Sequence, residues 1–386
     1  MTKTMALLAS ALLLSGCATV AEETATTSPG AMLEQMVPQL IADEKVAGIG
    51  IAMIEDGKVR DSWYFGEQEP GRPVDAKTVF NTASVAKTVI SELYIDLDDR
   101  QYIDLDAPIA ERISHDDLAG DPRFAALTPR ILLAHTSGLR NWPHQYEDGK
   151  LAFDFAPGEK FGYSGAGIEM AAQYAAASLG ATYRDLAWEY VLGPADVEQM
   201  SLGAIEPWME GHLARPMGYD GQWSSIAETN SNLSSGQSDS AADDLLVTVP
   251  AYGRFLEWVI ADRENHAMRR DIRSSVLDEG NYRCREEVTA VCPQAAGHSL
   301  GWQVNNYGNH DVVFHSGSDS GENALVYFSP DTRDGAVIFV NGANGWVPMV
   351  RIVEVLGQEP EFADYLRGII ADLMNRPLEP LASTDR

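Results

Sequence analysis

Strand-like segments occur at both ends of this 386-residue chain, and helical patterns fill its middle. Near the start, Gly48–Ile54 and Lys58–Gly66 are rich in strand-forming residues, and an Asp-Gly pair between them predicts a hairpin turn. Further strands are predicted late in the chain, at Leu300–Tyr307, Asp311–His315, Ala324–Phe328 and Ala336–Asn341. Helices are predicted in between, at Thr88–Leu97, Glu169–Leu179 and Leu245–Ile260. This order predicts an α/β (α+β) fold, in which an antiparallel sheet flanked by helices is completed by both chain ends and an all-helical lobe is inserted between them.

Two more helices are expected next to the sheet. An early one spans positions 33–41, where Pro38 predicts a kink or a late start, and the last one carries an apolar stripe from Phe362 to Leu373. A polar stretch from Asp220 to Ser240 predicts a long loop of the kind that can line a pocket. The predicted domain covers residues 31–376. Its sheet lobe comprises 31–83 and 295–376, its helical lobe comprises 84–294, and a tail follows at 377–386.

The first residues indicate an export signal. Lys3 precedes the apolar run Met5–Leu14, which is too short to span a bilayer. The run ends in Leu-Ser-Gly-Cys, the pattern of a lipoprotein signal, so we expect cleavage of residues 1–16, acylation of Cys17 and a flexible tether over 17–30. An ordinary secretory signal with an incidental cysteine is the alternative. Ala18 after the cysteine resembles lipoproteins sorted to the outer membrane, which implies the periplasmic side of that membrane in a host with two membranes.

The charge balance excludes some partners. The net charge is −29, which argues against nucleic acid and against electrostatic binding to anionic lipid, because both need clustered cations. A lipid anchor, rather than charge, is therefore expected to hold the protein at a membrane. The chain has only seven lysines, and none lies beyond Lys160.

The two remaining cysteines, Cys284 and Cys292, lie eight positions apart. In an oxidising compartment we expect them to pair as a disulfide, with buried free thiols as the alternative. The chain contains no H-E-x-x-H sequence, and we expect no metal and no other cofactor.

One pair of residues suggests nucleophilic catalysis. Ser84 and Lys87 stand three residues apart at the start of a predicted helix, so their side chains share one face. A hydroxyl becomes a good nucleophile only when a neighbouring group takes its proton, and a desolvated lysine can do so. An exposed helix start explains an isolated S-x-x-K equally well.

Three later segments can complete such a site. Leu132–Leu139 contains His-Thr-Ser-Gly after an apolar run, and Tyr163 lies on a turn that could bring it to a Ser–Lys pair. The strand ending in His315, Ser316 and Gly317 has small residues that would let a substrate backbone approach. The N–H of Ser318 would then join that of Ser84 in an oxyanion hole. Taken singly, each segment also has a purely structural explanation.

In this order the segments resemble the serine β-lactamase-related family, the group of class C β-lactamases, DD-peptidases and esterases. The resemblance covers residues 30–345 and includes Gly301-Trp302 before the last strand motif. It implies a catalytic cleft between the two lobes, with Ser84 as the acylated nucleophile and Lys87 and Tyr163 as its proton-transfer partners. It also implies that His315 stands at the third motif and that His135 and Ser137 shape a turn.

Two departures from the family pattern bear on the substrate. His315 stands where the β-lactamases and DD-peptidases usually carry the lysine that meets a substrate carboxylate, and Gly165 replaces the asparagine of the second motif. By resemblance to esterase and aminopeptidase members, we expect an exported serine hydrolase that acts on an ester or small amide. The alternatives are a β-lactamase or DD-peptidase acting on lactams or cell-wall peptides, and a catalytically weak cell-envelope binding protein.

Overall fold

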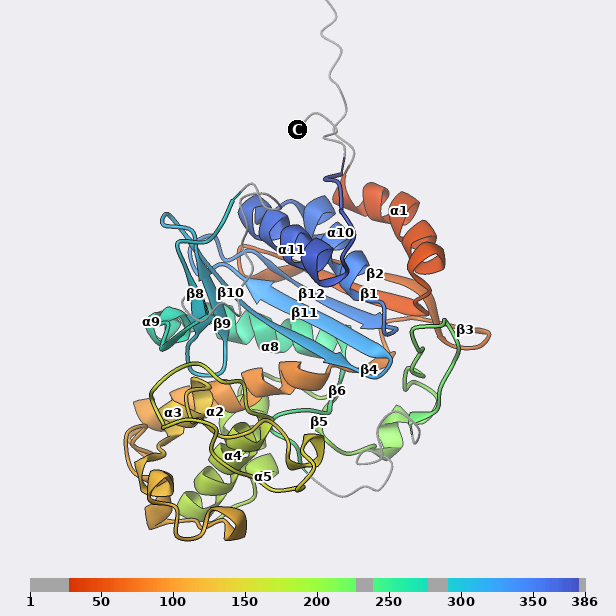
Figure 1. The fold of residues 1–386 in the computed structure, drawn as a ribbon. Coiled ribbons are helices and arrows are strands. Elements are labelled where there is room, and N and C mark those ends of the chain that lie inside the picture. The colour runs from red at the N-terminus through yellow and green to blue at the C-terminus, as the bar shows by residue number, and fades with distance from the viewer. Residues whose placement is uncertain (1–27, 227–238, 277–290, 382–386) are drawn as a thin grey trace, which may run out of the picture.

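A nine-stranded antiparallel sheet forms the centre of the computed structural model, which describes residues 28–226, 239–276 and 291–381 (Figure 1). Its strand order is β3-β2-β1-β12-β11-β10-β9-β8-β7, so strands from both parts of the chain meet where β1 pairs with β12. The predicted sheet completed by both chain ends is therefore confirmed. The strands are β1 Gly48–Glu55, β2 Lys58–Glu69, β3 Arg72–Pro73, β7 Ser274–Ser275, β8 Ala295–His298, β9 Gln303–Asn306, β10 Asp311–Asp319, β11 Glu322–Phe328 and β12 Gly335–Asn341.

The predicted hairpin joins β1 to β2. Asp56 and Gly57 both have positive φ, 50° and 77°, as a two-residue type I′ turn requires. Side chains of β1 alternate between two apolar cores, with Ile51 in one and Ala52 in the other. The sheet is therefore covered on both faces.

Helices α1, α10 and α11 cover one face, and α8 lies against the other (Figure 1). Helix α1 spans Pro29–Glu44 and runs through Pro38, so the late start is wrong. Burial of Leu33 and Val37 offsets the one backbone hydrogen bond that the proline cannot donate. Helix α10 (Trp346–Leu356) was not predicted, whereas α11 (Pro360–Leu373) agrees with the predicted stripe.

The second lobe is mainly helical, but it also carries a three-stranded sheet of order β4-β6-β5 that the sequence analysis did not predict. The predicted helix Leu245–Ile260 is wrong in its first four residues, which form strand β6 before α8 begins. Periodicity cannot distinguish a strand from a helix in so short an apolar run. The remaining strands and α-helices are β4 Val79–Asn81, β5 Met200–Leu202, β6 Leu245–Thr248, α2 Lys87–Asp99, α3 Pro129–Leu133, α4 Gly165–Leu179, α5 Tyr183–Ala187, α8 Val249–Ala261 and α9 His266–Arg270.

A buried ion pair ties α2 to α9. Arg269 and Glu92 are both completely buried, and the guanidinium donates to the carboxylate at 2.6 and 2.9 Å. The Trp302 indole N–H donates to the same carboxylate at 2.8 Å, and Asp262 accepts from Arg269 at 2.7 Å. This network fixes the helix that follows Ser84 against the sheet lobe.

Several sequence predictions concern residues outside the described ranges. These include the export signal, Cys17, Cys284 and most of the predicted loop from Asp220 to Ser240. Cys292 is disulfide-bonded, and its pairing with Cys284 stays a prediction. Among the helices of the described ranges, none has both the length and the apolar character to cross a membrane.

Candidate active site

Ser84 is displayed by a short 3-10 turn, η1 (Ala83–Ala86), directly before α2. Of residues 81–90, Ser84 alone is not buried. Ala83 has φ +46°, a left-handed conformation that alanine rarely adopts, and its N–H donates to the side chain of Asn81 at 3.1 Å. The turn therefore holds a strained backbone that presents the Ser84 hydroxyl at the surface.

Lys87 lies beneath this hydroxyl. Its side chain is 1% exposed, and its Nζ lies 3.0 Å from Ser84 Oγ. The carbonyl of Ala242 also accepts a hydrogen bond from Nζ. A neutral amine at this distance can take the proton of the hydroxyl, so the geometry suits the predicted Ser–Lys chemistry.

Tyr163 completes the predicted group of three. Lys87 Nζ lies over its ring, 4.9 Å from the centroid. The His135 ring stacks on the Tyr163 ring, with 4.3 Å between the two centroids. Within the described ranges, no hydrogen bond joins the Tyr163 hydroxyl to Ser84 or Lys87. Its part in proton transfer stays a prediction.

That prediction is tested by removing each proton-transfer group. We expect Lys87→Ala and Tyr163→Phe each to slow acylation of Ser84 by about 10²-fold or more, because general acid–base catalysis contributes this much. The measurement is the labelling rate with a fluorophosphonate probe. The matched controls are Lys77→Ala and Tyr190→Phe, which remove the same groups from positions outside the site. Normal rates in the first pair would show that these residues do not carry the proton.

Three buried histidines surround this group: His135, His298 and His315. Burial is the main cause that lowers the pKa of each; the pKa of His298 falls to about 3, and those of the other two fall well below the usual value. The nearby Lys87 charge lowers all three pKa values further. All three rings are therefore neutral at neutral pH. His298, at the end of β8, was missed by the sequence analysis, since nothing in its local sequence indicates that the fold brings it to Tyr163 and His135.

The third motif lies on β10 beside the nucleophile. A Cβ at Gly317 would lie 2.0 Å from the Thr82 carbonyl oxygen and 3.2 Å from the Ser84 nitrogen, so only glycine allows β10 to approach this closely. Pairing with β9 stops at Phe314, whereas pairing with β11 continues to Asp319. Within the part of the chain that the structure describes, the segment from His315 to Asp319 thus has an edge next to Ser84 that pairs with no strand, where a substrate backbone can pair. The oxyanion hole formed by the N–H groups of Ser84 and Ser318 stays a prediction.

His315 offers no positive charge at this edge. Its Nδ1 lies 2.8 Å from the carbonyl oxygen of Ser316, which can only accept, so Nδ1 carries the proton. Its buried Nε2 has no hydrogen-bond partner among the described residues and presents a lone pair. Because the ring is also neutral, the third motif lacks the cation that usually meets a substrate carboxylate.

Gly165 is fixed by packing. A Cβ at this position would lie 2.2 Å from the Trp142 ring, and the Gly165 N–H donates to Asn141 Oδ1 at 2.7 Å. The asparagine of the family pattern therefore has no room here. The packing of Trp142 against the second motif therefore requires glycine at position 165.

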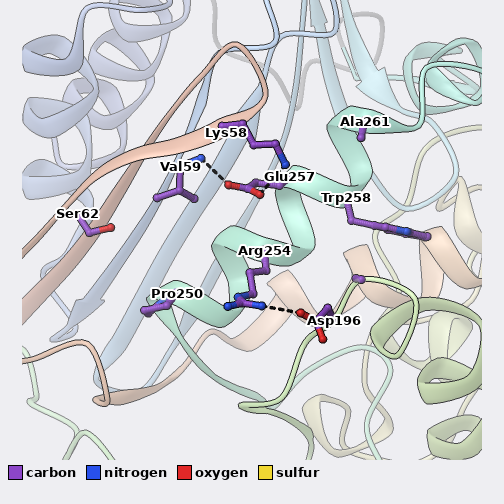
Figure 2. A pocket seen from close by; sticks show the side chains of 10 residues that line it. Lys58, Val59, Ser62, Asp196, Pro250, Arg254, Glu257, Trp258 and Ala261 are labelled. Atoms are coloured by element: carbon purple, nitrogen blue, oxygen red, sulfur yellow. Dashed lines mark hydrogen bonds and ion pairs between the residues drawn. The ribbon is translucent and has the colours of Figure 1, made fainter.

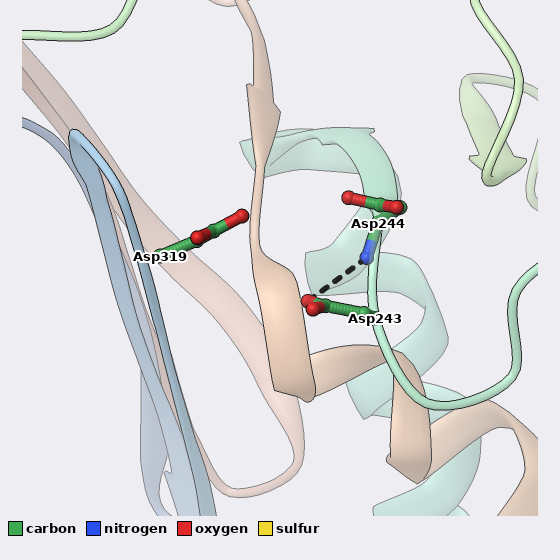
Figure 3. Close-up of side chains that lie close together, drawn as sticks. All are labelled: Asp243, Asp244 and Asp319. Carbon is green, nitrogen blue, oxygen red and sulfur yellow. Dashed lines mark hydrogen bonds between the residues drawn. The ribbon is translucent and has the colours of Figure 1, made fainter. Parts of the chain in front are cut away.

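A group of carboxylates lies near Lys87. Oxygen atoms of Asp243, Asp244 and Asp319 lie within 4.8 Å of one another, and in the part of the chain that the structure describes this is the one group able to hold a metal ion (Figure 3). Burial raises the pKa of Asp243 to about 6; the nearby Lys87 charge opposes this increase, and Asp319 adds to it. Carboxylate oxygens suit a hard cation, although the sequence analysis expected no metal.

Residues Gly297–Gly301 have the G-x-S-x-G spacing of an α/β-hydrolase nucleophile, a pattern not used in the sequence predictions above. Ser299 in this segment is completely buried and follows an antiparallel strand, whereas a nucleophile elbow joins a strand to a helix. Its hydroxyl donates to the Trp302 carbonyl at 3.4 Å. Ser299 is therefore not a second nucleophile.

A pocket of about 580 Å³ lies elsewhere, between β2 and α8 (Figure 2). Two ion pairs cross it, Lys58 with Glu257 at 3.0 Å and Arg254 with Asp196 at 2.7 Å. None of its lining residues is a predicted site residue.

Comparisons with known proteins identify the family. The family model described as Beta-lactamase matches residues 33–352. The chain therefore belongs to the beta-lactamase family, as its motifs predicted.

Individual relatives are more distant. The esterase EstB of Burkholderia gladioli is 29% identical over 30% of this chain and 30% of its own length. The curated relatives that the chain matches are covered over only 36%, 44% and 30% of their lengths. Two solved structures share the fold at low identity. A D-amino acid amidase from Ochrobactrum anthropi has TM-score 0.66 and 18% identity over 86% of this chain and 99% of its own, and a class C β-lactamase has TM-score 0.65 and 17% identity over 86% and 96%.

Proposed function

We propose that this protein is a serine hydrolase that forms an acyl-enzyme on Ser84. The observation that carries the proposal is the 3.0 Å contact between Lys87 Nζ and Ser84 Oγ, in a turn where the serine alone is not buried. Lys87 takes the hydroxyl proton as Oγ attacks the substrate carbonyl, and the oxyanion is stabilised by the N–H groups of Ser84 and Ser318. Lys87 and Tyr163 return the proton to the leaving group. Water then hydrolyses the acyl-enzyme by the reverse proton path.

We propose an ester or a small amide as the substrate. The neutral His315 gives a substrate carboxylate no cation to meet, and the carboxylates of Asp243 and Asp319 make the surroundings more negative. An ester also needs less leaving-group assistance than an amide, so it is the more forgiving substrate for this site. The similarity to an esterase and to a D-amino acid amidase supports the same chemistry.

The test compares two chromogenic substrate classes. Purified protein should hydrolyse p-nitrophenyl acetate or butyrate with a kcat/KM at least about 10²-fold above that for a chromogenic cephalosporin, since one missing charge-assisted contact and one missing amide contact weaken lactam binding. A preference for the cephalosporin would instead indicate a β-lactamase or a DD-peptidase acting on cell-wall material. Failure of wild type to turn over either substrate or to react with a fluorophosphonate or penicillin probe would indicate a binding protein.

We further propose that the protein is exported and lipid-anchored through Cys17, in the cell envelope and, in a host with two membranes, on the periplasmic side of the outer membrane. The apolar run Met5–Leu14 followed by Leu-Ser-Gly-Cys supports this. Several acyl chains on one residue bind a membrane stably, where one chain binds only weakly.

Replacing the acylated residue tests the anchor. We expect Cys17→Ser to move the protein from the membrane fraction to the soluble fraction when cells are fractionated. Ser62→Ala is the control, because it changes one exposed residue of the folded domain and leaves the lipid signal intact. Unchanged membrane retention of Cys17→Ser would contradict lipidation.

A further inference from the structure

The second motif lacks its usual asparagine, so Lys87 must be held by another group. We propose that Glu169 is a positioning residue, which holds the segment 240–242 so that the Ala242 carbonyl keeps the Lys87 amine at Ser84. This inference rests on the proposed function, because it concerns the residue assigned there as the base. It adds a residue that acts through Lys87 and does not touch the substrate.

The contacts form a short chain from Glu169 to the nucleophile. One carboxylate oxygen of Glu169 accepts hydrogen bonds from the Ser240 hydroxyl at 3.0 Å, the Ala241 N–H at 3.0 Å and the Ala242 N–H at 2.9 Å. The carbonyl of Ala242 accepts from Lys87 Nζ, which lies 3.0 Å from Ser84 Oγ. Ala242 thus donates its N–H to Glu169 and accepts a hydrogen bond from Lys87 at its carbonyl.

Among the described residues, two other hydrogen bonds order the ends of this segment: the Ser240 N–H donates to the Leu202 carbonyl at 3.3 Å, and the Asp243 N–H donates to the Ser240 hydroxyl at 3.0 Å. Residues 241–243 form bends, outside any helix or strand, so no ladder of backbone hydrogen bonds fixes the Ala242 carbonyl. Hydrogen bonds to a carboxylate are about twice as strong as those between neutral groups. The three hydrogen bonds that Glu169 accepts hold Ala241 and Ala242 themselves, and we expect them to set the direction of the Ala242 carbonyl.

The position of Glu169 links this segment to the second motif. Glu169 lies in α4, which begins at Gly165 directly after Tyr163 and Ser164. Ser164 caps the helix by accepting the Gly167 N–H at 2.9 Å. Helix α4 thus carries Glu169 and directly follows Tyr163. The ring that lies against Lys87 and the carboxylate that holds the segment 240–242 are therefore positioned by the same element.

Electrostatics around the carboxylate fit this role. Burial raises the pKa of Glu169, while the three hydrogen bonds and the nearby Lys87 charge oppose that increase. Tyr183 and Asp243 also lie close enough to interact with its charge. Desolvation of a carboxylate costs free energy, and hydrogen bonds offset that cost. Here the donors that offset it belong to the segment 240–242, which contacts Lys87.

The experiment compares two substitutions of the same residue. We expect Glu169→Ala to lower kcat for p-nitrophenyl butyrate by about 10²-fold with KM within about 2-fold, because a misplaced base slows chemistry without altering substrate contacts. We expect Glu169→Gln to recover kcat to within about 10-fold of wild type, because its amide oxygen can accept the same three hydrogen bonds. Rates are expressed per folded molecule, using near-UV circular dichroism and urea titration to measure the folded fraction.

A control removes a buried carboxylate far from Lys87. Glu359 is 3% exposed and precedes α11, so Glu359→Ala should lower stability and leave kcat unchanged. Three results would overturn the positioning role. These are a normal kcat in Glu169→Ala, an increase in KM alone, and equal losses of kcat in the Ala and Gln variants. If Ser84→Ala is inactive and Glu169→Ala is fully active, only this inference fails. If wild type itself forms no acyl-enzyme, the proposed function fails and the inference fails with it.

Discussion

Replacing Ser84 with alanine should remove fluorophosphonate labelling completely and lower ester hydrolysis by about 10⁴-fold or more, to near the uncatalysed rate. The effect is this large because Ser84 Oγ is the atom that becomes acylated, and it is the hydroxyl that lies 3.0 Å from Lys87 Nζ. The substitution deletes one oxygen from a residue that is not buried. The fold and the Lys87 environment should therefore be retained, so the loss of activity measures the contribution of Ser84 to the reaction.

A second serine provides the control. Ser62→Ala removes the same atom from an exposed position on β2, and we expect normal labelling and normal hydrolysis. The decisive measurement is intact-protein mass spectrometry after probe treatment, which counts adducts directly. An adduct on Ser84→Ala protein would mean that another residue is the nucleophile.

The largest expected effect on stability concerns Arg269. We expect Arg269→Met to lower the free energy of unfolding by about 3–5 kcal/mol, because it leaves the completely buried carboxylate of Glu92 without its charged partner. The Trp302 N–H is then the one donor, among the contacts described above, that still reaches this carboxylate. Urea titration followed by tryptophan fluorescence measures the change.

Two further variants distinguish the effect of leaving a buried charge unpaired from the effect of losing any arginine on stability. Arg254 pairs with Asp196 at 2.7 Å, but their side chains are 60% and 81% exposed, so Arg254→Met should cost only a small fraction of the loss. The double variant Glu92→Gln with Arg269→Met should recover part of the stability, because it removes the unpaired charge. Equal losses in Arg254→Met and Arg269→Met would contradict the role assigned to burial.

Local patterns correctly indicated much of the architecture. Alternating or continuous apolar runs identified six strands of the large sheet, because a strand must bury its side chains in a period of two. The Asp-Gly pair at positions 56–57 identified the hairpin, since few other residues adopt positive φ there. The same methods failed at Leu245–Thr248, where a four-residue apolar run becomes a strand only because β4 and β5 lie on either side of it.

The site divides in the same way. By itself the sequence determined the fold class, the family and the pairing of Ser84 with Lys87, since two residues three positions apart in a helical turn share a face whatever surrounds them. Only the tertiary structure decided that His298 joins the site, that Trp142 leaves no room for a side chain at Gly165, and that Glu169 reaches residues 240–242. These contacts join segments that are distant in the chain. Their partners are chosen by packing of the whole domain, which no short stretch of sequence records.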